Sequence, residues 1–113
     1  MQIPNADRAV IDPAKLRDYL LSRTHPVGRF KAAFFLSLGY SAENWARFET
    51  DLRSQHLPEN AMTDESTRYG QKYLIRATLI GPNGSTAAVV SVWVVRSGED
   101  FPRFVTAYPE VSG

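Results

Sequence analysis

The hydrophobic pattern of this chain of 113 residues changes its period near Gly70, and this change limits the fold more than any other feature of the sequence. Before Gly70, apolar residues recur every three or four positions, which places them on one face of a helix. After Gly70, they alternate with other residues, as in a strand that buries one face. Helices followed by strands are typical of an α+β domain.

About three helices are expected before residue 58. Asp12 followed by Pro13 is a favourable helix start, because an aspartate side chain accepts hydrogen bonds from the first backbone amides. Gly39 is suited to ending a helix in the left-handed conformation, and Ser41 can cap the helix that follows. The expected helices cover residues 12–22, 28–38 and about 41–57.

Residues 58–70 are mostly polar and are expected to form a loop that closes the helical half. The alternation that follows predicts an antiparallel meander of three to four strands, since a short segment near residues 9–11 can add a strand at one edge. The helices are expected to pack on one face of this sheet and to leave the other face free for a ligand or partner. A single domain is predicted over residues 1–113, with a helical half at 1–57, a loop at 58–70 and a sheet at 71–109.

Composition excludes several classes of chemistry. The chain has no cysteine, which rules out disulfides, thiolate metal sites and cysteine nucleophiles. It also lacks a glycine-rich phosphate loop, a Gly-x-Ser-x-Gly motif and a His-x-His or His-Glu-x-x-His spacing, so we expect no metal and no cofactor. The first residues show no signal-peptide pattern, and no apolar run is long enough for a membrane span. We therefore expect a cytoplasmic protein without a membrane partner.

The net charge of +1 argues against a long nucleic-acid-binding stripe, but one compact basic cluster stands out. Residues 19–42 contain no acid and carry three basic side chains together with His25. Surrounding cations favour a neutral imidazole, which suits a general base, and Lys31 follows in the same stretch. The competing interpretation is a helix start with a solvated basic side. His56, at an expected helix end, is predicted to be structural through the helix dipole.

The last expected strand carries three further candidates, Arg103, Thr106 and Tyr108. Strand geometry places Thr106 and Tyr108 on one face and Arg103 on the other, unless a bulge after Pro102 shifts the register. Two hydroxyls on one face can hold a phosphate. Threonine and tyrosine are also common strand residues, so a purely structural role is the alternative.

The chain resembles a bacterial domain family that has no assigned activity, and the likeness covers nearly its whole length. The clearest shared motif is His25-Pro26-x-Gly28-x-x-Lys31-Ala32. The other shared motifs are Ile3-Pro4-Asn5-Ala6, Tyr69-Gly70-Gln71, Gly81-Pro82-Asn83-Gly84 and the closing stretch from Gly98 to Tyr108.

More distantly, the chain is similar to the small RNase toxins of the barnase, EndoU, colicin and RelE group. That likeness implies metal-independent RNA cleavage through a 2′,3′-cyclic phosphate, with RNA as substrate and a small neutralising protein as partner. It implies an active site with His25 as base, Arg103 as phosphate ligand, and Thr106 and Tyr108 on the final strand; the acid is either Lys31 or Tyr108. The alternative is a non-enzymatic interaction module, immunity- or antitoxin-like or an assembly protein, that binds a protein through its sheet face.

Overall fold

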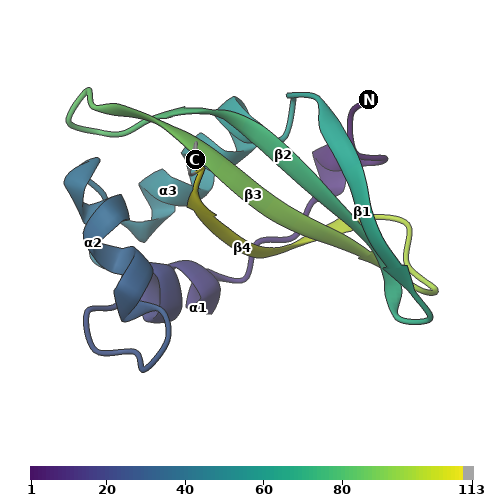
Figure 1. The fold of residues 1–113 in the computed structure, drawn as a ribbon, viewed down its shortest axis with the longest axis horizontal. Helices are drawn as coiled ribbons and strands as arrows, with labels where there is room; N and C mark the ends of the chain where they lie inside the picture. The colour runs from purple at the N-terminus through teal and green to yellow at the C-terminus, as the bar shows by residue number, and fades with distance from the viewer. Residues whose placement is uncertain (111–113) are drawn as a thin grey trace.

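The computed structural model describes residues 1–110 and confirms an α+β architecture, with helices mostly in the first half and an antiparallel sheet in the second. Figure 1 shows the helices gathered to one side of a long, twisted sheet. None of the helices in the described part of the chain has both the length and the apolar character that crossing a bilayer requires. The helical segments are η1 (Ala6–Arg8), α1 (Pro13–Lys15), η2 (Leu16–Leu20), α2 (Arg29–Ser37), α3 (Trp45–Asp51) and η3 (Leu52–His56).

The helix starts follow the local sequence. The Asp12 side chain accepts a hydrogen bond from the backbone amide of Ala14 at 3.0 Å, so the predicted cap at Pro13 is present. Gly39 ends α2 with a φ of 101°, in the left-handed region expected of it. Ser41 and Asn44 exchange side-chain and backbone hydrogen bonds just before α3 begins.

The sheet is a four-stranded antiparallel meander in the order β1-β2-β3-β4. Its strands are β1 (Ala61–Thr67), β2 (Gly70–Ile80), β3 (Thr86–Arg96) and β4 (Pro102–Pro109). The prediction of a loop over residues 58–70 is wrong for most of that stretch. All residues of β1 except Ala61 are exposed, so this edge strand lacks the apolar alternation that marks a half-buried one.

Two features shape the strand that carries the predicted site residues. β4 contains a bulge: Thr106 pairs with Val92 and Phe104 with Trp93, which leaves Val105 as the extra residue. The other side of β4 is met by Val10, which forms a single parallel bridge with Arg103 in place of the short strand expected over residues 9–11. β4 is therefore an edge strand, and within residues 1–110 another segment covers only its first half.

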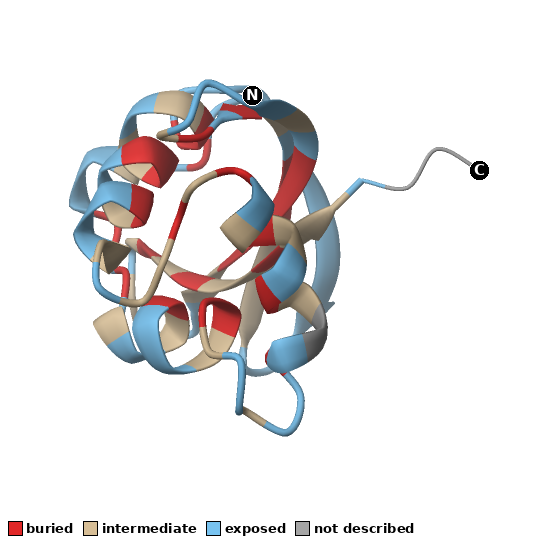
Figure 2. Cartoon of the chain, turned by 90° about the vertical axis from the view of Figure 1, so that its left-hand side faces the viewer, coloured by how far each residue is buried: buried red, intermediate tan, exposed pale blue. Residues whose placement is uncertain are grey.

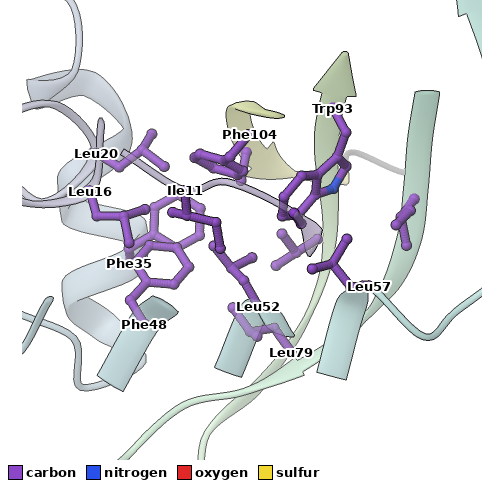
Figure 3. Close-up of a cluster of buried hydrophobic side chains, with 14 of the residues drawn as sticks. Ile11, Leu16, Leu20, Phe35, Phe48, Leu52, Leu57, Leu79, Trp93 and Phe104 are labelled. Carbon is purple, nitrogen blue, oxygen red and sulfur yellow. The ribbon is translucent and has the colours of Figure 1, made fainter. Parts of the chain in front are cut away.

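The hydrophobic core lies between the helices and one face of the sheet (Figure 3). Trp93 and Phe104 meet edge to face at 5.2 Å between their ring centroids, and Phe35 and Phe48 pack together at 4.9 Å. Figure 2 shows the buried segments on the sides of the helices and strands that face one another. Phe35 of α2 and Phe104 of β4 belong to this one core, which holds the two elements together.

Candidate functional site

Lys31, in the first turn of α2, lies at the centre of a cluster of hydroxyl groups. Its Nζ donates one hydrogen bond to Thr106 Oγ1 of β4 at 3.1 Å and another to Tyr19 Oη of η2 at 3.4 Å. The side chain is half-buried, and within residues 1–110 no carboxylate forms an ion pair with it. An ammonium surrounded by neutral hydroxyls keeps its charge available to an incoming anion.

Two tyrosine rings flank this amine. Lys31 Nζ lies 5.4 Å from the ring centroid of Tyr19 and 5.9 Å from that of Tyr108. The faces of aromatic rings attract cations, so both rings help to hold the amine beside the sheet edge. The structure thus brings together three residues singled out in the sequence, Lys31, Thr106 and Tyr108.

An open cleft of about 450 Å³ lies in front of these groups. Lys15 forms part of its wall and donates a hydrogen bond from Nζ to the backbone carbonyl of Val105 at 3.3 Å. Sequence reasoning misses Lys15, which no motif marks, and Tyr19, which fits the apolar face of its helix. One signal was present: the two residues are four positions apart, so they share a helix face. The residues that line the cleft are Ala14, Lys15, Tyr19, Lys31, Val105 and Thr106.

His25 is held by backbone groups and forms no hydrogen bond with Thr106 or Lys31. Its Nδ1 accepts hydrogen bonds from the backbone amides of Val27 at 3.0 Å and Gly28 at 2.9 Å. Its ring meets Tyr19 edge to face, with 4.9 Å between the centroids. Because Nδ1 is an acceptor, these hydrogen bonds assign the proton of the neutral ring to Nε2. In this conformation the imidazole has no free lone pair with which to take a proton.

Gly28 is the point at which the segment from His25 to Lys31 packs against η2. A Cβ at position 28 would lie 2.0 Å from the backbone oxygen of Tyr19, far closer than any van der Waals contact. Glycine therefore allows the start of α2 to lie directly against η2. This close approach brings Lys31 within hydrogen-bonding distance of Tyr19.

Arg103 lies apart from the Lys31 cluster. Its Nε and Nη2 donate to the two carboxylate oxygens of Glu99, each at 2.9 Å, and its guanidinium lies 5.1 Å from the ring centroid of Phe101. The hydrogen bond from Arg103 lowers the pKa of Glu99 below its usual value, and the same bond raises the pKa of Arg103. Arg103 lines a second, smaller cleft of about 180 Å³.

His56 is structural, but the dipole explanation for it is wrong. The residue is fully buried, and its Nδ1 lies 2.8 Å from Ser91 Oγ, which accepts a hydrogen bond from Trp93 Nε1 at 2.9 Å. Burial lowers the pKa of His56 to about 4, so the ring is neutral and does not complement a helix dipole as a cation.

No metal or cofactor site is assigned. Across residues 1–110, no three histidine, aspartate or glutamate side chains come close enough together to hold a metal ion. The side chains that line the cleft in front of Lys31 offer amines and hydroxyls.

Comparisons with known proteins bear on the fold and the family. One chain of the structure described as "Contact-dependent growth inhibition toxin - immunity protein complex from Klebsiella pneumoniae 342" shares this fold, with a TM-score of 0.56 and 23% sequence identity. The match covers 89% of this chain and 99% of that one. No curated protein matches. The model of a family described as a domain of unknown function, DUF6883, matches residues 2–111, and the chain belongs to that family.

Proposed function

We propose that this protein is a small, toxin-like, metal-independent ribonuclease whose active site is the cleft between α2 and β4. The observation that carries the proposal is the amine of Lys31, which has no acidic partner among residues 1–110 and is held 3.1 Å from Thr106 Oγ1 in an open cleft. A second amine, that of Lys15, lines the same cleft. Two cations and two hydroxyls in one cleft suit a phosphodiester, because preorganised donors stabilise the charge of a phosphorane.

The proposed reaction is an internal transfer within RNA. The ribose 2′-oxygen attacks the adjacent phosphorus, the bond from phosphorus to the 5′-oxygen breaks, and a 2′,3′-cyclic phosphate and a 5′-hydroxyl result. Lys31 stabilises the phosphorane and donates a proton to the leaving 5′-oxygen, while a water molecule in the open cleft takes the 2′-hydroxyl proton. That proton returns to Lys31 through solvent, so the step balances.

His25 is assigned a positioning role, because its Nδ1 is already an acceptor and its ring supports Tyr19. The asparagine Oδ1 can replace Nδ1 as an acceptor. We expect His25→Asn to retain RNA cleavage within about tenfold of the wild type, whereas a lost general base typically costs about 10²- to 10⁴-fold. The measurement is the cleavage rate as a function of pH.

His25→Ala is the matched variant, because it leaves the amides of Val27 and Gly28 without their acceptor. We expect it to lower the free energy of unfolding by about 1–3 kcal/mol in urea titrations. A loss of more than about 100-fold in cleavage by a well-folded His25→Asn protein would restore His25 as the base.

The partner follows from the proposed toxin-like role. A chain with this fold occurs in a complex of a growth inhibition toxin with its immunity protein, which supports a small protein that neutralises the proposed activity. The alternative, an immunity-like or assembly module that binds through its sheet face, is supported by Met62. This side chain is 53% exposed and pairs with Leu74 on the face opposite the core.

The decisive experiment is incubation of the purified protein with total RNA in the presence of EDTA. We expect fragments that end in 2′,3′-cyclic phosphate, and slower growth of bacteria that express the protein. Thr106→Val, which removes the hydroxyl that accepts from Lys31, should slow the cleavage. If the folded wild type leaves transfer, ribosomal and messenger RNA intact and does not affect growth, the ribonuclease is excluded and the interaction module replaces it.

A further inference from the structure

The two clefts beside β4 adjoin each other. The cleft in front of Lys31 and the smaller cleft beside Arg103 share Lys15 and Val105 in their walls. The smaller cleft is lined further along by Arg96. Basic side chains therefore follow the edge of β4 from Lys31, past Lys15, to Arg103 and Arg96.

The positive charge along this edge is only partly compensated. Within the described residues, Lys15, Lys31 and Arg96 form no ion pair, and the one paired cation of the series is Arg103, bound to Glu99. Asp12 lines the smaller cleft, and its side chain accepts a hydrogen bond as the cap of α1. The edge therefore presents a net positive charge.

The length and lining of this edge favour one nucleic-acid strand. Thr106 pairs with Val92, and Arg96 lies four positions further along β3, or about 13 Å away, which is more than a single phosphate can bridge. Aromatic rings lie at both ends: Phe101 beside the guanidinium of Arg103, and Tyr108 beside the amine of Lys31. Cations that follow a backbone, with aromatic rings on which bases stack, are typical of single-strand binding.

We propose that the edge of β4 is a binding track for single-stranded RNA, in which Lys15, Arg103 and Arg96 bind the phosphates that follow the one held at Lys31. The proposal rests on the ribonuclease function and adds to it a substrate of several nucleotides. The pair with Glu99 fixes the orientation of Arg103 and partly compensates its charge.

The test uses fluorescently labelled 2′-O-methyl oligouridylates of two and six nucleotides, which cannot be cleaved because the 2′-oxygen is blocked. Binding is measured by anisotropy over a range of salt concentrations. We expect the hexamer to bind more tightly than the dimer. Arg96→Ala should weaken hexamer binding about three- to fivefold and make the salt slope of log K less negative by about 0.7, with no effect on the dimer. Glu99→Gln should strengthen hexamer binding.

Arg76→Ala and Glu110→Gln are matched controls, since these residues form an ion pair elsewhere on the sheet, at 3.5 Å. Neither should change hexamer binding.

Equal effects of Arg96→Ala and Arg76→Ala, or equal affinities for dimer and hexamer, would overturn the track. If the wild type still cleaves RNA in that case, the ribonuclease stands without the track; if it neither cleaves RNA nor binds either oligonucleotide, both proposals fall. Polyglutamate serves as a competitor for the labelled hexamer. If it competes as strongly as unlabelled hexamer does, and if Arg96→Ala weakens its binding equally, the edge binds an acidic protein and the RNA proposal is overturned.

Discussion

Lys31→Met is expected to reduce RNA cleavage about 10⁴-fold or more while the protein remains folded. Methionine keeps most of the length of the side chain but removes the ammonium that contacts Thr106 and Tyr19. The loss combines a missing proton donor with a missing charge at the phosphorane, each of which typically contributes about 10²- to 10³-fold or more. The measurement is the single-turnover cleavage rate at saturating protein.

Lys72→Met is the matched control for this prediction. Lys72 lies in β2 and lines neither of the two clefts beside β4, so the same chemical change there should leave the rate within about twofold of the wild type. Circular dichroism and urea titration establish that both variants are folded. Cleavage by Lys31→Met at the wild-type rate would remove Lys31 from the active site.

Acid is expected to destabilise the fold through His56. Burial lowers the pKa of His56 from 6.5 to about 4. Between pH 6.5 and about pH 4, the unfolded chain therefore binds a proton at His56 and the folded chain does not. The contribution to stability is complete above about pH 7 and falls as the pH drops through 6.5 towards 4. The shift corresponds to a total loss of about 3 kcal/mol, about 2 of them by pH 5. The measurement is the free energy of unfolding in urea at several pH values.

His56→Asn isolates this contribution. Asparagine offers an acceptor near the position of Nδ1 for Ser91, but it does not titrate. The variant should be less stable at pH 7, and its free energy of unfolding should fall less than that of the wild type between pH 7 and 5. Subtracting one curve from the other cancels the other titrating groups, including carboxylates such as Asp18 whose pKa is lowered. Parallel curves would contradict the prediction.

The parts of the fold that were predictable are those that bury one face. The valine-rich alternation of β3 and the helical spacing of α2 reflect burial against the core, and both elements are found where expected. β1 was missed because it is an edge strand that buries little more than Ala61. Its polar side chains satisfy a strand and a loop equally well.

The candidate site was predictable only in part, because its geometry depends on packing between distant segments. Residue type drew attention to Lys31 and Thr106, and the structure places them 3.1 Å apart across 75 positions of sequence. Residue type gave no indication that His25 Nδ1 accepts two backbone amides, or that Glu99 holds Arg103. Hydrogen bonds of this kind depend on the exact path of a loop or turn, which hydrophobic periodicity does not encode.

The half-covered edge of β4 also affects solubility. Among the described residues, Val10 covers the strand only near Arg103, and at the bulge the carbonyl of Val105 accepts a hydrogen bond from the amine of Lys15 instead of from another strand. Free strand edges invite pairing between molecules, and lysine side chains are a common protection against it. The two amines assigned to RNA would thus also keep neighbouring copies from joining edge to edge. A variant that lacks both lysines would be prone to self-association. Its molecular mass in solution therefore has to be measured together with its activity.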